Sequence, residues 1–267
     1  MRLRPLRPCR RERHRGGRTS LTGAPGTLYV GTSGFAYPGW SPRFYPPGLA
    51  DGDRLPFYAS RFPAVELNNT FYARPTVEKI RTWVAATPPD FRFVIKAQRG
   101  AASRGLTSTP EESVAWLTER LGAFGDRLGG VLLSVPENVH RRDDGSSDTT
   151  LGRLLAAWPR VTPLVMEFPH PSWHVDETFA ALRASGAMLS ATEHPEDDAP
   201  PTLRLTGGSL YLRLRRHEYA EAQIAGWAER IRPFLEAGHG VYVFFRHDDT
   251  GRATELADAL RARVSTG

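Results

Sequence analysis

The chain has 267 residues, 40% of them hydrophobic, which is enough for one large domain with a full-sized core. Its single cysteine, Cys9, excludes a disulfide framework and a thiolate metal cluster, so we expect a reducing, cytoplasmic environment. No apolar run approaches the roughly 18 residues that cross a bilayer, and no apolar signal segment opens the sequence, so no membrane association is expected.

The formal net charge of +6 is concentrated at the N-terminus. Residues 1–18 carry eight arginines against Glu12, a balance of +7, which leaves the rest of the chain at −1. An arm rich in Arg, Pro and Gly cannot offset the entropy of ordering, so residues 1–26 are predicted to be disordered. Two interpretations stay open for this arm. It binds nucleic acid, or it is an extension without function, which includes a start codon assigned too far upstream.

From residue 27 on, apolar runs alternate with amphipathic segments. Strands are predicted at about 28–32, 64–68, 91–96, 130–135, 163–168, 187–191, 209–214 and 241–246. Helices are predicted at about 53–61, 76–86, 111–124, 149–158, 176–184, 221–236 and 252–264, with Gly129-Gly130 as a turn before the fourth strand. The pattern predicts eight βα units in an α/β fold, a single-domain (β/α)8 TIM-like barrel over residues 27–264, with an open doubly wound sheet as the alternative.

Five of these runs end in a charged or amide group: 64–68, 93–96, 164–167, 210–213 and 243–246. Continuous apolar runs are typical of parallel strands buried on both faces. A barrel would bring all five ends to one rim, and that rim is where (β/α)8 enzymes carry their active sites.

Several motifs make the chain similar to a known family. They are Tyr29 to Gly34, Tyr37 to Trp40, Phe44 to Pro46, Val65 to Tyr72, Asp90 to Phe93 with Lys96, Glu167-Phe168 with His170 to Trp173, and Tyr211 to Leu214. With them the chain resembles the bacterial and archaeal family named domain of unknown function 72, from about Leu28 to Arg261. The resemblance implies a (β/α)8 barrel and leaves the reaction open.

The chain departs from the pattern of that family at several positions. The family carries a histidine seven residues after Lys96, where this chain has Ser103, so a candidate general base is missing. Pro169 stands where the family favours arginine, and Arg215-Arg216 stand where it tends to read His-Gly. Arg246-His247-Asp248-Asp249 stand where relatives often carry asparagines. These departures imply a different substrate or an activity that has drifted.

Lys96 is one of two lysines, with Lys79, in a chain that has 33 arginines. Its position therefore suggests a need for an amine. A desolvated lysine can act as a base or a Schiff-base nucleophile, which a guanidinium cannot do. Two other interpretations stay open: the ammonium pairs with Glu66 or Glu167, or it binds a substrate anion.

Glu66 and Glu167 end the second and fifth strands, so they are predicted to face a common cleft. Such a pair could serve as acid and base or nucleophile in glycoside hydrolysis. Asn68 lies on the same strand face as Glu66 and could bind a sugar or a base edge. The alternative is that both glutamates form ion pairs with Lys96 and Arg213.

An anion site is predicted at the seventh and eighth strand ends, from Arg213, Arg215, Arg216 and Arg246 together with a helix that opens after Thr250-Gly251. Arginine forks suit phosphate or carboxylate. The alternative is that Asp248 and Asp249 neutralise these arginines.

His170 and His174 have the spacing of metal ligands beside Glu167, but Pro171 disfavours one helical face, so no metal is predicted. No nucleotide-binding glycine motif occurs, so no cofactor is indicated.

The sequence thus predicts a hydrolase, lyase or isomerase that acts on a phosphorylated or carboxylated small molecule. Nucleic-acid binding or processing, and a catalytically inactive scaffold, stay as alternatives. The predicted catalytic residues are Glu66, Lys96 and Glu167, and the predicted substrate contacts are Asn68, Tyr72, His170, Trp173, Arg213 and Arg246.

Overall fold

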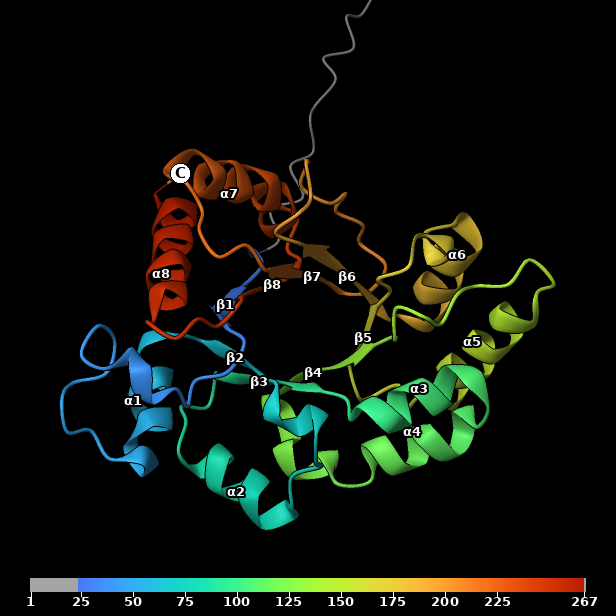
Figure 1. Cartoon of the computed structure of the whole chain (residues 1–267), viewed down its shortest axis with the longest axis horizontal. Coiled ribbons are helices and arrows are strands. Elements are labelled where there is room, and N and C mark those ends of the chain that lie inside the picture. The colour runs from blue at the N-terminus through green and yellow to red at the C-terminus, as the bar shows by residue number, and fades with distance from the viewer. Residues whose placement is uncertain (1–23, 267) are drawn as a thin grey trace, which may run out of the picture.

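The computed structural model describes residues 24–266 and contains a barrel of parallel strands ringed by helices (Figure 1). The strands are β1 (Leu28–Thr32), β2 (Ala64–Leu67), β3 (Arg92–Lys96), β4 (Leu128–Ser134), β5 (Leu164–Glu167), β6 (Met188–Glu193), β7 (Ser209–Leu214) and β8 (Gly240–Phe245). They pair in the order β1-β8-β7-β6-β5-β4-β3-β2. This arrangement confirms the predicted (β/α)8 TIM-like fold.

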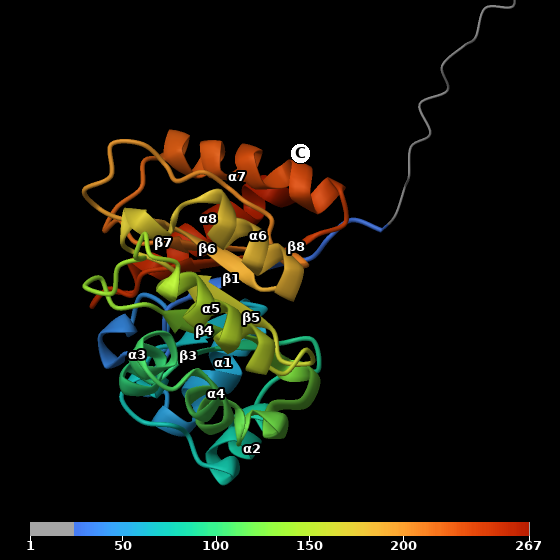
Figure 2. The same ribbon diagram turned by 90° about the vertical axis from the view of Figure 1, so that its right-hand side faces the viewer.

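The helices lie on the outside of the strands (Figure 2). They are α1 (Arg54–Arg61), α2 (Val77–Ala85), α3 (Arg99–Thr107), α4 (Pro110–Thr118), α5 (Ser146–Ala157), α6 (Asp176–Ser185), α7 (Glu221–Glu236) and α8 (Arg252–Ser265). The turned view of Figure 2 shows α5 and α6 on the side that faces the viewer. Short 3₁₀ helices lie at Pro38–Trp40, Asp51–Asp53, Asn69–Phe71, Leu121–Arg127 and Pro171–Trp173. No helix stands between β6 and β7, where a Pro-rich loop connects the two strands.

Three local predictions differ from the structure. Helix α3 was not predicted, because its segment is rich in small residues. It forms with Gln98 as its cap, whose side chain accepts a hydrogen bond from the Ala101 amide at 2.9 Å. The helix expected at 111–124 is divided into α4 and a 3₁₀ segment. Gly129 and Gly130 lie inside β4 instead of in a turn, at a register shift between β3 and β4.

The barrel closes between β1 and β2, which share one bridge, Ser33 to Glu66. At this seam the Gly34 amide donates to the Glu66 carbonyl at 2.7 Å. Gly31 allows the close approach, because a Cβ at this position would overlap the Ala64 carbonyl oxygen. The start of the fold is held by the Gly26 amide, which donates to the Leu235 carbonyl at 2.7 Å. Residues 1–23 of the predicted disordered arm lie outside the described residues.

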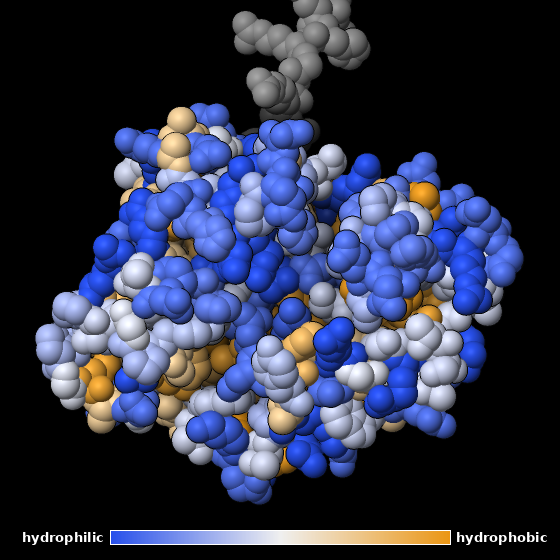
Figure 3. Space-filling view, viewed as in Figure 1, coloured by the Kyte–Doolittle hydropathy of each residue, from blue (hydrophilic) through white to orange (hydrophobic). Residues whose placement is uncertain are grey.

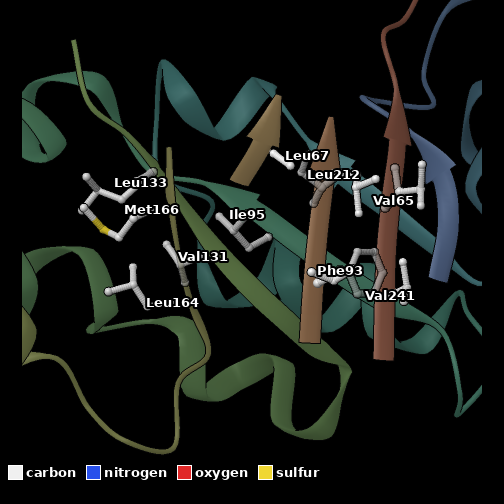
Figure 4. Packing of buried hydrophobic residues seen from close by; sticks show 14 of the residues in the cluster. Val65, Leu67, Phe93, Ile95, Val131, Leu133, Leu164, Met166, Leu212 and Val241 are labelled. Atoms are coloured by element: carbon white, nitrogen blue, oxygen red, sulfur yellow. The ribbon is translucent and has the colours of Figure 1, made fainter. Parts of the chain in front are cut away.

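Two apolar layers position the rim. The outer layer packs the outward side chains of the strands, such as Val65, Phe93 and Leu212, against the helices (Figure 4). The inner layer fills the barrel with Ala64, Val94, Leu132, Val165, Met188, Tyr211, Tyr242 and Phe244. Because side chains alternate along a strand, residues two positions after these also point inward. With the exception of Phe244, they are polar, and they form the floor of the C-terminal rim.

The molecular surface is mostly hydrophilic on the face shown in Figure 3, where apolar residues form separate spots. Within residues 24–266, no helix is both long enough and apolar enough to span a bilayer.

Candidate active site at the C-terminal rim

Strand alternation places a set of polar groups directly above the apolar core of the barrel. Glu66 follows Ala64 on β2, Glu167 follows Val165 on β5, and Arg213 follows Tyr211 on β7. Ser134 follows Leu132 on β4, and Thr192 on β6 pairs in register with Arg213. All of these side chains therefore meet at one level inside the barrel.

Arg213 joins the two glutamates. Its Nε and Nη2 donate to the two carboxylate oxygens of Glu66 at 2.9 and 2.8 Å, and its Nη1 donates to Glu167 Oε1 at 2.7 Å. The guanidinium is buried, with 3% of the residue exposed. The predicted substrate contact through Arg213 thus has little open surface, because the carboxylates occupy its donors.

Glu66 and Glu167 receive further donors. Ser33 Oγ and Tyr211 Oη donate to Glu66 at 2.8 and 2.7 Å. Ser134 and Thr192 donate to the two oxygens of Glu167 at 2.6 and 2.7 Å. Each carboxylate is therefore held in one orientation by at least three hydrogen bonds.

Both carboxylates are held in their ionised form. Burial alone would raise the pKa of Glu66 and Glu167, but the Arg213 charge and the donated hydrogen bonds outweigh burial and hold both pKa values below the ordinary range. Burial disfavours a charged Arg213, yet Glu167 and Glu66 raise its pKa above the ordinary value. The three groups form a fixed, ionised unit, which we call the Arg213 triad (Glu66, Glu167 and Arg213).

Lys96 stands apart from this unit. It follows Val94 on β3 and points into the barrel, and it pairs in register with Leu132, one inward position below Ser134. Its Nζ lies 4.5 Å from the centroid of the Phe71 ring. Among the described residues, no carboxylate oxygen lies within the 4.0 Å of an ion pair with this amine. The interpretation that Lys96 pairs with Glu66 or Glu167 is therefore wrong, since Arg213 takes both.

The surroundings of Lys96 disfavour its protonated form. Burial is the largest cause, and the Arg213 charge adds to it, while Glu167 and Glu66 act in the opposite direction. The result is a pKa below the ordinary lysine value. The amine that the sequence singled out is thus present, inward and without a counter-ion.

A second polar level lies above the Arg213 triad. It contains Asn68 after β2, Arg215 after β7, and Arg246 and His247 after β8. Three of its buried atoms have no hydrogen-bond partner within residues 24–266: Asn68 Oδ1, Arg215 Nη1 and His247 Nδ1. Buried polar groups are usually satisfied, so orphaned ones at a rim indicate a place that a ligand or water fills.

Charge and stacking link this upper level. Burial, and then Arg213, lower the pKa of Arg215. Burial is the largest cause that lowers the pKa of His247, and the charges of Arg215 and Arg246 add to it. The His247 ring stacks on the Tyr37 ring, with 4.8 Å between the ring centroids. Burial and the Glu66 charge raise the pKa of Tyr37 to about 12. At neutral pH this level presents neutral Tyr37 and His247 beside the two arginines.

The N-terminus of α8 is already occupied. The Asp248 carboxylate accepts from the backbone amides of Thr250, Arg252 and Ala253 at 2.7, 3.0 and 2.7 Å. These are the amides that a bound phosphate would use. The expectation of an anion on this helix end is therefore wrong, because the protein supplies its own carboxylate there.

A cavity opens beside the triad, over β4 and β5. It has a volume of about 630 Å³, and its lining includes Phe71, Arg99, Ser134, His140 and His170. Two of its lining residues contact the groups of the polar floor, because the Phe71 ring lies under the Lys96 amine and the Ser134 hydroxyl donates to Glu167. An adjoining cavity of about 500 Å³ shares Phe71 and Arg99 and adds Tyr72, which is 81% exposed.

The remaining predicted contacts fall in different places. His170 lines the larger cavity, where its ring stacks on His140 with 3.7 Å between centroids. Trp173 is buried in the core, and its indole donates to the Val139 carbonyl at 2.8 Å. His174 Nε2 lies 2.8 Å from the Phe168 carbonyl oxygen, away from Glu167. In the part of the chain that the structure describes, no three His, Cys, Asp or Glu residues are grouped to hold a metal.

Comparisons with known proteins agree on the family. The family model described as "Protein of unknown function DUF72" matches residues 29–267. The chain belongs to this family. A UPF0759 protein from Bacillus subtilis, YunF, is 24% identical over 266 residues, covering 85% of this chain and 91% of YunF.

Solved structures of DUF72 proteins show the same fold. The DUF72 protein of Thermotoga maritima aligns with a TM-score of 0.77 at 25% identity, over 90% of this chain and 99% of the other. The DUF72 protein of Enterococcus faecalis aligns with a TM-score of 0.74 at 19% identity, over 90% of this chain and 96% of the other. The resemblance predicted from the motifs is confirmed.

The structure locates the departures from the DUF72 pattern. Ser103 lies on α3 and lines the smaller cavity. Pro169 lines the larger cavity beside His170. Arg215 and Arg246 belong to the upper polar level. Ser103 and Pro169 thus line cavities at the rim, whereas Arg216 pairs with Glu193 and Asp248 caps α8.

Sequence reasoning missed four groups at this place: Tyr37, Arg99, Tyr211 and His247. Tyr37 and Arg99 lie in loops or helices whose direction no periodicity reveals. Tyr211 had a usable signal, because it stands two residues before Arg213 and so shares its strand face.

Proposed function

We propose that this DUF72 protein is an enzyme that acts on a small anionic molecule, carboxylated or phosphorylated, at the upper polar level of the barrel mouth. One observation carries the proposal. Lys96 points into the rim without a counter-ion, while the carboxylates on either side are fixed on Arg213. A lysine whose role is only structural would be expected to form an ion pair with one of those carboxylates. An amine left free beside a cavity is the arrangement that amine chemistry requires.

The roles follow from the contacts. Lys96 supplies the reacting amine, as a base or a nucleophile. Arg215 and Arg246 provide positive charge for the substrate anion, and Arg215 has a free buried donor. Glu66 and Glu167 act on the substrate indirectly, because they orient Arg213 and hold it at the floor. Asn68, Tyr72 and His170 line or border the space above.

The protonation states favour two of the three predicted reaction classes. Glycoside hydrolysis by a carboxylate pair needs one carboxylic acid that is protonated. Glu66 and Glu167 both have lowered pKa values and share Arg213, so neither suits that role. A lysine of lowered pKa suits proton abstraction or attack on a carbonyl. We therefore favour a lyase or an isomerase over a hydrolase.

The proposal is tested first by ligand binding. Carboxylic acids, sugar phosphates and inorganic phosphate are screened by thermal shift against the wild-type protein, Arg215→Met and, as a matched control, Arg183→Met on the exposed face of α6. A ligand at 100 times its Kd adds about 2.7 kcal/mol of stability. The stabilisation should survive in Arg183→Met and fall in Arg215→Met. Equal stabilisation of all three proteins, or stabilisation by oligonucleotides alone, would contradict the proposal.

Turnover of an identified ligand gives the second test. Lys96→Met should lower kcat by about 10²–10⁴-fold, the usual contribution of one acid–base group. Lys79→Met, which removes the exposed lysine of α2, should leave kcat unchanged. If the anion binds and Lys96→Met has no effect on any conversion, the protein is a binding scaffold, as the loss of the family histidine at Ser103 also allows.

A further inference from the structure

Lys96 and Arg215 stand on opposite sides of the barrel mouth. They extend β3 and β7, which stand four positions apart in a ring of eight strands and therefore lie on opposite sides. An eight-stranded barrel is only wide enough for its side chains to fill. A molecule that contacts both residues must therefore be small, with its anionic group few bonds away from the atom that meets the amine.

The groups on the two sides of the mouth have complementary chemistry. On one side the Lys96 amine lies on the face of Phe71, with no carboxylate in ion-pair range within the described chain. On the other side Arg215 Nη1 is buried and has no partner among residues 24–266. A nucleophilic amine matches a carbonyl carbon, and a free guanidinium donor matches a carboxylate.

We propose that Lys96 forms a Schiff base with a small 2-oxo acid whose carboxylate is held by Arg215. This inference rests on the proposed function and names its substrate class. The amine nitrogen attacks the carbonyl carbon and forms the C–N bond. The carbonyl oxygen then leaves as water, taking the two protons of the neutral amine, and a C=N bond remains.

The surroundings support this step. A lysine becomes nucleophilic when it is desolvated or lies near other cations, and Lys96 has both conditions. The adjacent cavity of about 630 Å³ provides room for a substituent on the far side of the carbonyl carbon. Tyr37 and His247 border the upper level and are neutral at neutral pH, so neither opposes an incoming carboxylate.

The chain offers an unusually clean experiment, because Lys79 and Lys96 are its only lysines. The full-length protein is incubated with pyruvate or glyoxylate and sodium cyanoborohydride, which delivers hydride to the imine carbon and makes the bond permanent. Peptide mass spectrometry then locates the adduct, whose added mass is that of the acid less one oxygen atom. Lys79, which is exposed on α2, is the internal control.

We expect Lys96 to be labelled at least tenfold faster than Lys79. In Lys96→Arg this label should disappear. In Arg215→Met, at a limiting concentration of the oxo acid, the rate of Lys96 labelling should fall at least tenfold. In the control Arg183→Met, Lys96 should be labelled at the wild-type rate. Acetone, which has the carbonyl without the carboxylate, should label poorly. Since the adduct is mapped on the wild-type protein, the result stands even if a variant folds badly.

Equal labelling of the two lysines, or no label at Lys96, would overturn the Schiff base. Faster labelling by a phosphorylated ketone than by any 2-oxo acid would overturn the substrate class. If anions still stabilise the wild type through Arg215 while Lys96 stays unlabelled, the Schiff base fails and the proposed function survives with Lys96 as a base. If no anion binds in the thermal-shift screen, both fail together.

Discussion

At the residue scale, the dominant feature is a buried arginine that holds two glutamates in place. Desolvating three charges is costly, and their contacts offset the cost only because nearly every carboxylate oxygen has more than one donor. A hydrophobic core would fill this space more cheaply. The arrangement makes sense as a rigid, charged floor for a site, and its stability contribution depends on all members being present.

Removing one member of the Arg213 triad should therefore be severe. Glu66→Gln leaves Arg213 with one carboxylate and should lower the free energy of unfolding by about 3–5 kcal/mol. The matched control is Glu111→Gln, which breaks a similar fork to Arg153 on the surface, with both side chains 53% exposed, and should cost much less than Glu66→Gln. Urea unfolding measures both. Equal losses would contradict the account.

The carboxylates of Glu66 and Glu167 also make the stability of the fold depend on pH. Glu66 and Glu167 have lower pKa values in the folded than in the unfolded chain, so their stabilisation is full above the unfolded value of about 4.3 and is lost as the pH falls through the folded pKa. Glu66→Gln should lose less stability between pH 6 and pH 3 than the wild type. If the free energy of unfolding of Glu66→Gln and of the wild type falls equally with pH, the triad does not control acid unfolding.

The limits of sequence reasoning are clear at this scale. The inward direction of Glu66, Lys96 and Glu167 follows from alternation on short apolar strands, and the sequence predicted it. The partner of each group was not predictable, because it depends on which side chain reaches across the barrel. Arg213, not Lys96, reaches both glutamates, and that choice needs three-dimensional distances.

At the scale of elements, strands were easier to predict than the helices around the rim. An apolar run between turn residues defines a buried strand by itself, whereas α3 begins in a run of small residues that lacks an amphipathic pattern. The function of the α8 N-terminus was also misjudged from sequence. An Asp three or four residues before a helix can cap it, and Asp248 does so here.

The Asp248 cap provides a prediction for one element. Asp248→Ala removes acceptors for three backbone amides and should lower the free energy of unfolding by about 1–2 kcal/mol. Asp249→Ala changes the exposed neighbouring carboxylate and should cost less than about 0.5 kcal/mol. Thermal or urea unfolding distinguishes them. If the two substitutions cost the same, Asp248 does not hold this helix end.

At the scale of the whole molecule, the fold depends on closing a ring whose last seam is narrow. β1 and β2 share one bridge, and the bridge residues, Ser33 and Glu66, also belong to the polar floor. The residues that close the barrel therefore also hold the site. Residues on the seam should matter more than equally buried residues elsewhere.

Two glycines test this with opposite signs. Gly31→Ala would push a methyl group into the Ala64 carbonyl and within 2.7 Å of the Tyr58 hydroxyl, so it should destabilise the protein by more than about 1 kcal/mol. Gly152→Ala on α5 meets nothing within 4 Å and should stabilise it by about 0.5–1 kcal/mol. If Gly31→Ala also stabilises, the seam is not tight.

The central claim is that Lys96 is an amine of lowered pKa without a counter-ion, and it can be measured directly. With ¹³C-labelled lysine the spectrum of this protein contains two side-chain signals, which Lys79→Arg assigns. The pH is then varied on the folded protein and on the urea-unfolded chain, where lysine titrates near about 10.4. The account predicts that folded Lys96 loses its proton at a clearly lower pH than in the unfolded chain. A folded Lys96 that titrates at or above the unfolded value would show a charged, paired lysine and would contradict the account.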